Sequence, residues 1–463
     1  MSFGIRPLAA VLLAPVLLGS VTSLGLGCAR SWAKVPASEA RQLRSTLTPF
    51  GAEKAGNQDR TIPAWTGGLT RLPAGLTGTD RMPDFYKDER KILTIDGSNA
   101  DRYVARLAPG TIYLLTHHDG YRIEIYPTHR PAAAPQWFYD ATFANATSTE
   151  IRGTNWVSNA KGGIPFPIPQ SGKEAIWNLN LGWHGVQTKS VASSFVVPVN
   201  GTPTLTTTTV EQRWQPYADM SYRIGPFVGY YLTELDDMIG PPSRAGDVVL
   251  SWQSLDQTMV PQITWQYLAG QRRLRRAPQL NYDGLSAECG AIMTVDERSL
   301  FNGSPDRYNI ALVGKREMYV PYDNNGMFLH ASGDLLGPND LNPDDVRWEL
   351  HRVWVLDLTL AAGKHHQLPH RRLYLDEDSW AAVASEDYDA DGKLSRIGQA
   401  FNYMAPALPA LISDTSVIYD THESGYCLAH VVTSDHPNER VLVPATFDPG
   451  FFSPNRVAAA SAH

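Results

Sequence analysis

RWELHRVWVLDLTL, residues 347–360, alternates large apolar side chains with polar ones. Trp348, Leu350 and Trp354 stand at even positions, and Glu349 stands between the first two. Successive side chains of a β-strand point to opposite faces of the sheet, so a period of two is typical of a strand that buries one face. We therefore predict a half-buried strand here, at the start of the central part of the fold.

Shorter apolar runs follow this strand as far as Phe401. Two of them, at residues 371–375 and 380–385, are separated by acidic turn residues, and DYDADG at residues 387–392 precedes the next run. An Asp-Gly pair tolerates the positive φ angles of a tight hairpin turn. The whole stretch therefore predicts an antiparallel meander.

Strand signals are spread over most of the remaining chain, because β-branched and aromatic residues favour a pleated backbone. The predicted strands cover residues 112–116, 121–126, 177–183, 190–199, 205–214, 248–255, 263–268, 317–322, 417–419 and 427–433. Helices are predicted at residues 38–47, 84–93 and 99–107, and after Ser171, which has the capping-box spacing to Glu174. We expect a mainly β (α+β) fold: a large curved antiparallel sheet or incomplete barrel, with a few helices covering the concave face.

Residues 1–33 have the pattern of a signal peptide. Arg6 precedes an apolar run, and Ala33 ends a stretch of small residues that a signal peptidase can cleave. The predicted location is the periplasm. A protein anchored through a lipid on Cys28 is the alternative.

We expect a single domain with insertions over residues 34–463, because no linker, charge block or repeat interrupts this part of the chain. Residues 34–110 read as helices and loops, and residues 111–463 are rich in strands. The formal net charge of the whole chain is -7, which argues against a protein that coats nucleic acid.

Two cysteines follow the predicted signal peptide, Cys289 and Cys427. In an oxidising compartment they can form a disulfide. Two buried free thiols explain the same residues equally well, so the sequence leaves both states open.

The local signatures of common enzymes are missing from the sequence. It contains no Gly-x-Ser-x-Gly elbow, no His-Glu-x-x-His and no Cys-x-x-Cys. We therefore expect no enzyme, with no catalytic residues, no metal and no cofactor.

Two groups of side chains match metal sites only in part. The acidic turn at residues 387–392 matches the first positions of an EF-hand loop, but Gly398 stands where a carboxylate ligand is needed. A hairpin turn explains the same residues better. His365, His366 and His370 are spaced closely enough to hold a transition metal, but they lie without an acidic neighbour between Gly and Pro residues, which favours a solvated loop.

Arg272, Arg273, Arg275 and Arg276 form the one dense basic cluster of the sequence, and Trp265 precedes them. Guanidinium groups at a strand end can bind a lipid phosphate or an acidic partner. Pairing with the chain's own acids across strands is the alternative. We take these residues as candidates for contact with an anionic group or a partner protein.

Aromatic side chains are abundant on the predicted strands. Most of them should fill the core, but a curved open sheet has more concave apolar surface than a few helices can cover. The loop GGIPFPIP at residues 162–169 is either a strap across the core or a lid over a hydrophobic mouth. The candidates for contact with a hydrophobic ligand are Phe166, Ile168, Trp214, Trp265, Trp348 and Trp354.

Several stretches resemble proteins of Gram-negative bacteria. LYLDED at residues 373–378 and YDADGKL at residues 388–394 are similar to strand-turn-strand units of the Lol-type periplasmic lipoprotein carriers. Other stretches resemble a domain-of-unknown-function family that is often labelled outer-membrane lipoprotein-sorting protein. They are GAEKAGN (51–57), IPAWTGG (62–68), YPTHR (126–130), FPIP (166–169), QRRLRRAP (271–278) and KREMYVPY (315–322). The resemblance implies a Lol-carrier-like fold, in which a curved antiparallel sheet surrounds a hydrophobic cavity covered by helices. It implies no established activity.

The expected export, the curved sheet and the strand aromatics predict a periplasmic carrier or binding protein for a hydrophobic molecule, such as a lipid or a lipoprotein acyl chain. The alternative is a non-enzymatic accessory subunit that docks on an envelope transporter or an outer-membrane protein, with the arginine cluster and sheet edges as contact surfaces. An open apolar cavity favours carrying, and a filled sheet interior favours docking.

Overall fold

The computed structural model describes residues 34–460 apart from 73, 76–82, 200, 223–228, 257–259, 279–281, 291, 406, 423–424, 436–439 and 449. One compact unit spans Trp32–His463. The predicted signal peptide, with Cys28, lies outside the described residues, and the single domain over residues 34–463 stays a prediction. Among the described residues, no helix combines the length and the apolar character that crossing a membrane requires.

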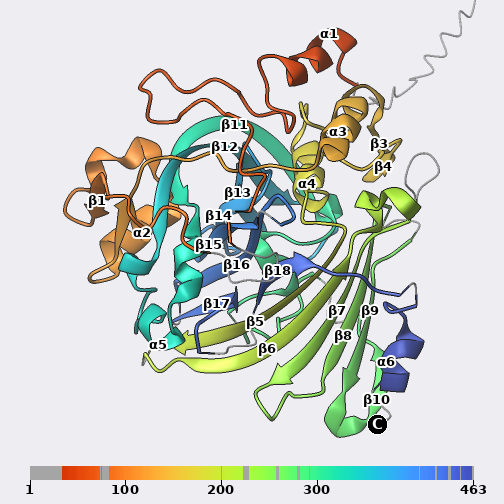
Figure 1. Cartoon of the computed structure of the whole chain (residues 1–463). Helices are drawn as coiled ribbons and strands as arrows, with labels where there is room; N and C mark the ends of the chain where they lie inside the picture. The colour runs from red at the N-terminus through yellow and green to blue at the C-terminus, as the bar shows by residue number, and fades with distance from the viewer. Residues whose placement is uncertain are drawn as a thin grey trace, which may run out of the picture. The chain divides into compact units, whose positions relative to one another are not determined.

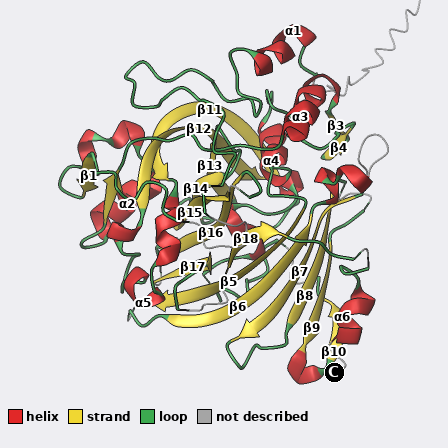
Figure 2. Ribbon diagram, in the orientation of Figure 1, coloured by secondary structure: helices red, strands yellow, loops and turns green. Residues whose placement is uncertain are grey.

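Strands dominate the regular structure, as Figure 2 shows. The strands are β1 (Leu93–Asp96), β2 (Arg122–Ile125), β3 (Glu150–Arg152), β4 (Trp156–Ser158), β5 (Gln187–Pro198), β6 (Thr204–Trp214), β7 (Tyr230–Gly240), β8 (Val248–Ser254), β9 (Ile263–Leu268), β10 (Arg273–Arg276), β11 (Tyr308–Pro321), β12 (Arg347–Leu360), β13 (His370–Asp376), β14 (Ala382–Tyr388), β15 (Leu394–Ala405), β16 (Ala410–Asp420), β17 (Gly425–Val431) and β18 (Arg440–Pro444). The α-helices are α1 (Ala37–Ala40), α2 (Pro109–His117), α3 (Gln136–Ser148), α4 (Gly172–Asn180), α5 (Ser332–Leu335) and α6 (Pro454–Ala460). The 3-10 helices are η1 (Arg41–Arg44), η2 (Ala100–Arg102), η3 (Val104–Arg106), η4 (Pro216–Ala218), η5 (Met220–Tyr222), η6 (Ala269–Gln271), η7 (Val295–Leu300), η8 (Pro305–Arg307), η9 (Asn324–Leu329) and η10 (Pro343–Asp345).

One sheet of 16 strands contains all the described strands except β3 and β4 (Figure 1). Its order is β1-β2-β12-β13-β14-β15-β16-β17-β5-β6-β7-β8-β9-β10, with β11 also on β12 and β18 also on β5. The pairs are antiparallel except for a short parallel contact between β2 and β12. Over the described residues β1 and β10, the two ends of this order, do not pair with each other, so the sheet is not closed. The prediction of a mainly β fold with a large antiparallel sheet and few helices is confirmed.

The predicted meander consists of β12, β13, β14 and β15. Its last turn is a hairpin in which Gly392 has a φ of 74° and the N–H of Lys393 donates to Asp389 Oδ1 at 2.9 Å. Asp387 lies outside this turn, buried in β14, and accepts from Arg371 Nε at 2.8 Å. The acidic stretch is therefore divided between a surface turn and a buried ion pair.

β12 is buried on both faces, so the prediction of a half-buried strand is wrong. Glu349 is 0% exposed and His351 1% exposed on the face that the alternation assigns to solvent. The reason is a second apolar cluster on that face, where Val353 packs with neighbouring strands and with the half-buried Leu69 and Phe85. These last two residues come from the N-terminal loops, which cover the sheet there.

Three predicted elements differ in type from the observed ones. Residues 112–116 lie in α2 and not in a strand. Pro109 favours the start of this helix, because the first turn of a helix leaves backbone N–H groups unpaired and proline has no N–H. Residues 177–183 end α4 and follow it, and the helix starts at the Ser171 cap as predicted. Residues 84–93 contain turns before β1 and no helix.

Candidate functional site

Strands β7, β8 and β9 have an apolar outer face and a polar inner face. Helix α6 packs against β8, β9 and β10 (Figure 1). On the outer face Leu235, Leu250 and Tyr267 pack with Phe452 and Val457. At the alternating positions, the inner face presents Glu234, Asp236, Met238, Val249, Ser251, Gln253, Thr264 and Gln266. The cavity formed by these inner-face positions has no aromatic side chain among its lining residues in the described part of the chain.

The four tryptophans proposed as ligand contacts lie in two separate clusters. Trp214 and Trp265 are half-buried members of the outer-face cluster. Trp348 is 3% exposed in the main core, where Trp354 also packs and stacks on Trp380 with 6.0 Å between ring centroids. The structure does not bring the four side chains to one site.

The loop at residues 162–169 is bound to its neighbours along its length. Asn178 of α4 accepts from the N–H of Phe166 at 2.9 Å and donates to its carbonyl at 2.7 Å. Tyr217 donates to another carbonyl of the loop at 2.8 Å. Phe166 and Ile168 pack in two different apolar clusters. These contacts fit a strap across the core better than a lid.

The predicted basic cluster is exposed on β10, at the end of the sheet order. Arg276 lies over the ring of Trp265, 5.6 Å from its centroid, and Arg275 donates to Gln266 at 3.5 Å. Within the part of the chain that the structure describes, no carboxylate forms an ion pair with Arg272, Arg273, Arg275 or Arg276.

The three neighbouring histidines each contact a different carboxylate, so they do not converge on one point. His366 is buried, and the prediction of a solvated loop without acidic neighbours is wrong for this residue. The pairs are His365 with Asp283 at 3.2 Å, His366 with Asp296 at 3.1 Å and His370 with Asp357 at 3.0 Å.

An apolar pocket of about 330 Å³ lies among an N-terminal loop and strands β1, β2, β11 and β12. Ile92, Leu93, Ile125, Tyr319 and Leu350 supply much of its wall. Ile92 is 68% exposed, whereas Leu350 and Ile125 are buried. A concave apolar wall with few polar groups is the common form of a small-molecule site.

Three of the stretches that carry the family resemblance meet at this apolar pocket. IPAWTGG contributes Pro63, YPTHR contributes Tyr126 and KREMYVPY contributes Tyr319. Arg60 and Thr61 add polar groups at its edge. Sequence reasoning missed the pocket, because its wall comes from segments more than 200 residues apart whose separate patterns signal only loops and strands.

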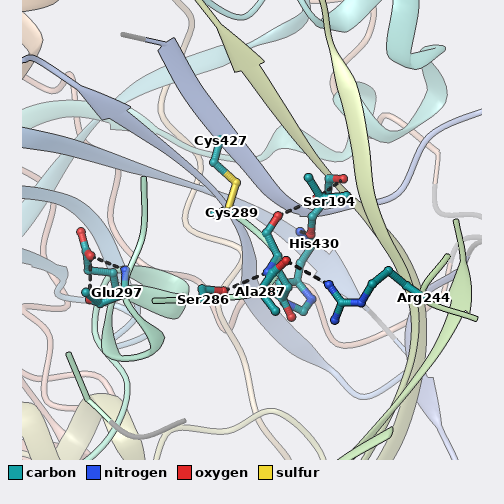
Figure 3. Close-up of a disulfide and its surroundings, with 11 residues drawn as sticks. Ser194, Arg244, Ser286, Ala287, Cys289, Glu297, Cys427 and His430 are labelled. Carbon is teal, nitrogen blue, oxygen red and sulfur yellow. Dashed lines mark hydrogen bonds and ion pairs between the residues drawn. A yellow bond between two sulfur atoms is a disulfide. The ribbon is translucent and has the colours of Figure 1, made fainter. Parts of the chain in front are cut away.

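Residues 286–302, here called the tethered segment, are joined to the sheet by a disulfide between Cys289 and Cys427 of β17 (Figure 3). Next to the disulfide, His430 Nε2 lies 2.8 Å from Glu288 Oε2. Both cysteines are fully buried. Of the two states that the sequence leaves open, the structure contains the disulfide.

Helix η7 in the tethered segment connects two distant parts of the sheet by ion pairs. On one side Asp296 Oδ2 lies 3.3 Å from Arg371 Nη1 of β13. On the other side the guanidinium of Arg298 donates to Glu211 of β6 and Glu234 of β7. The tethered segment therefore fills part of the sheet interior.

Arg298 is the centre of a group of buried and half-buried charges, here called the Arg298 network. Arg213 Nε lies 3.2 Å from Glu234, and Arg298 Nη1 lies 3.6 Å from Asp236. The network comprises the carboxylates Glu211, Glu234, Asp236, Glu288 and Asp414 and the bases Arg213, Arg298 and His430. None of these residues was a candidate from the sequence. A signal that could have identified some of them is a pair of charged residues two positions apart in a strand, because such side chains lie on the same face.

The carboxylates of the Arg298 network ionise to different extents. Burial raises the pKa of Asp236 well above its usual range, and the negative charge of Glu234 raises it further, against the effect of Arg298. Burial also opposes ionisation of Glu288, but the charge and hydrogen bond of His430 lower its pKa to about 2. Asp236 is thus the carboxyl that most readily keeps a proton.

Two small cavities flank Arg298, one of about 90 Å³ and one of about 100 Å³. Glu234, Arg298 and Asn302 line both of them. The larger cavity lies between the inner face of β7–β9 and the tethered segment, and we call it the polar pocket.

Comparison with known proteins gives a match over most of the chain. The sequence profile of the family described as "Protein of unknown function (DUF1329)" matches residues 94–457. A relative from Pseudomonas aeruginosa, "Uncharacterized protein PA3922", is 36% identical over 392 residues, which cover 82% of this chain and 84% of the relative.

Two solved structures are similar over part of the chain. A DUF1329 family protein from Desulfovibrio piger has a TM-score of 0.40 and 12% identity, covering 59% of this chain and 92% of its own. The LolA superfamily protein NE2245 from Nitrosomonas europaea has a TM-score of 0.37 and 8% identity, covering 62% of this chain and 99% of its own.

Proposed function

This chain belongs to the DUF1329 family, and from that premise we propose that it is an exported envelope protein that binds a hydrophobic molecule. The ligand is a lipid, a lipoprotein acyl chain or another apolar molecule, which the protein binds or carries without catalysis. Its location is the periplasm after cleavage of residues 1–33. The buried disulfide between Cys289 and Cys427 supports an oxidising compartment.

The apolar pocket is the observation that carries this proposal. Its volume of about 330 Å³ suits a small apolar molecule or a segment of an acyl chain. Each methylene buried there contributes about 0.8 kcal/mol. Arg60 and Thr61 lie at the edge, where the polar head of such a ligand can remain in water.

Native mass spectrometry of the purified protein tests the proposal directly. We expect a co-purifying apolar molecule that gentle organic extraction removes, and renewed uptake of dansyl-labelled undecanoic acid by the extracted protein. A protein that neither carries an apolar molecule nor takes up the labelled acid contradicts the proposal.

Ile92→Asp is expected to weaken uptake of the labelled acid about tenfold or more, because it places a charge against apolar ligand surface. Ile92 is 68% exposed, so the free energy of unfolding should change by less than about 0.5 kcal/mol. Fluorescence titration measures the first quantity, and urea denaturation measures the second.

Val313→Asp is the matched control, because Val313 is 61% exposed on β11 and does not line the apolar pocket. It should bind the labelled acid like the unmodified protein. Equal binding by the Ile92→Asp and Val313→Asp variants would remove the apolar pocket from the proposal.

A second candidate function, docking on an envelope transporter or an outer-membrane protein, is favoured by the exposed arginines of β10. An edge strand offers unpaired backbone groups to a partner, and guanidinium groups without acidic partners attract an anionic surface. The described residues supply no carboxylate to these arginines, which leaves them available for a partner.

Arg273→Glu with Arg275→Glu is expected to reduce the yield of photo-crosslinking from position 271 to an envelope protein in cells by about fivefold or more. Arg41→Glu with Arg90→Glu changes the net charge equally at two other exposed arginines and should leave the yield unchanged. If both double variants lost crosslinking yield equally, the loss would come from the changed net charge of the protein. That result would contradict docking through β10.

A further inference from the structure

The polar pocket contains a carboxyl group whose hydrogen-bonding capacity is not used by the protein. Asp236 is 8% exposed, and its Oδ1 has no hydrogen-bond partner. Its nearest cation is Arg298, at 3.6 Å from Asp236 Oδ2. A buried carboxylate left in this way costs free energy, and a bound cationic donor would offset that cost.

The charges around Asp236 leave room for one more cation. In the Arg298 network five carboxylates face two arginines and one histidine. Arg298 and Arg213 pair with Glu211 and Glu234, and His430 pairs with Glu288. Asp236 remains as the acid with the weakest pairing.

The wall of the polar pocket suits an organic cation better than a metal ion. The guanidinium of Arg298 already lies among Glu211, Glu234 and Asp236, so a metal ion on these three oxygens would have to displace it. Hydrogen-bonding side chains and short apolar side chains share the remaining wall, which includes Ser251, Gln253, Gln266, Met238, Val249 and Met293.

We propose that the polar pocket binds a small organic cation, a primary ammonium on a short aliphatic or hydroxylated body, through Asp236. The ammonium group donates to the carboxylate of Asp236, and the body contacts the apolar and amide groups of β7–β9 and of the tethered segment. The cavity volume of about 100 Å³ limits the body to a few carbon atoms. This site is separate from the apolar pocket and does not depend on the function proposed for it.

Binding of the cation should release a proton. Burial raises the pKa of Asp236, and the negative charges of Glu234, Glu211 and Glu288 raise it further. The positive charge of Arg298 acts in the opposite direction. A bound ammonium favours the ionised form, so it replaces the proton. The affinity should therefore rise with pH until Asp236 is ionised in the free protein.

Isothermal titration calorimetry with n-butylammonium and ethanolammonium tests the site. We expect saturable binding of at least one of them, no comparable binding of n-butanol or butyrate, and proton release seen as a dependence of the heat on the buffer. Asp236→Asn should weaken ammonium binding about tenfold or more.

Asp237→Asn is the matched control, because Asp237 is the next residue of β7, points to the other face and accepts from Gln212 at 3.2 Å. It should bind the ammonium probes like the unmodified protein, and so should Ile92→Asp. No saturable ammonium binding, equal affinity in Asp236→Asn, or tighter binding of Ca²⁺ or Zn²⁺ that Asp236→Asn abolishes would each overturn the proposal.

Discussion

Arg298→Met is expected to lower the free energy of unfolding by about 3–5 kcal/mol at neutral pH, because it removes one of the two guanidinium groups, Arg298 and Arg213, that pair with the buried carboxylates Glu211 and Glu234. Met has similar length and fills the same space, so the loss should come mainly from the uncompensated charges. Urea denaturation followed by tryptophan fluorescence measures it.

The loss should depend on pH. Burial opposes ionisation of Glu234, but Arg298 and Arg213 together lower its pKa. A carboxyl whose pKa is lower in the folded state contributes stability above its unfolded pKa and loses it as the pH falls. Removing Arg298 removes the larger of these two effects, so the difference between the two proteins should shrink below about pH 5.

Arg372→Met is the control, since Arg372 is a third exposed and pairs with Asp357 at 3.0 Å near the surface. Such a pair contributes about 0–1 kcal/mol. If Arg298→Met were no more destabilising than Arg372→Met, the tethered segment would not be held by the Arg298 network.

The fold could be predicted from sequence where the local pattern and the tertiary contacts agree. The central meander, its hairpin at Gly392 and the strand at residues 263–268 follow the alternation directly. The resemblance to a domain-of-unknown-function family is also confirmed. The sequence could not show that Leu69 and Phe85 cover the second face of β12, because they lie more than 250 residues away.

The candidate sites were harder to predict than the fold. β7 carries Glu234, Asp236 and Asp237 within four residues, a composition that disfavours a strand unless a distant partner neutralises it. That partner is Arg298, on a segment that a disulfide joins to β17. The tryptophans on predicted strands suggested a ligand site, but Trp214 and Trp265 pack on the outer face of the sheet.

The two proposed binding sites lie in different parts of one sheet. The tethered segment and the Arg298 network occupy the inner face of β7–β9 with charged and polar groups, which excludes an acyl chain from that part. The apolar pocket lies at the other end of the sheet order, beside β1, β2 and β12. We therefore expect the two proposed ligands, a hydrophobic molecule and a small cation, to bind independently.

Cys289→Ser with Cys427→Ser is expected to lower the free energy of unfolding by about 3–5 kcal/mol, because the disulfide closes a long loop between residues 138 positions apart. The same change frees one end of the tethered segment. Since Ser286, Glu288 and Met293 form part of the polar pocket, binding of the ammonium probes should also weaken.

Reduction of the unmodified protein with dithiothreitol should reproduce both effects, and the double serine variant should not respond to it. The apolar pocket contains no residue of the tethered segment, so uptake of the labelled acid should persist in the folded variant. A reduced protein, with free thiols shown by mass spectrometry, that kept its stability and its ammonium binding would mean that the ion pairs of η7 alone fix the segment. Loss of ammonium binding with retained acid uptake would instead establish that the disulfide supports one site and not the other.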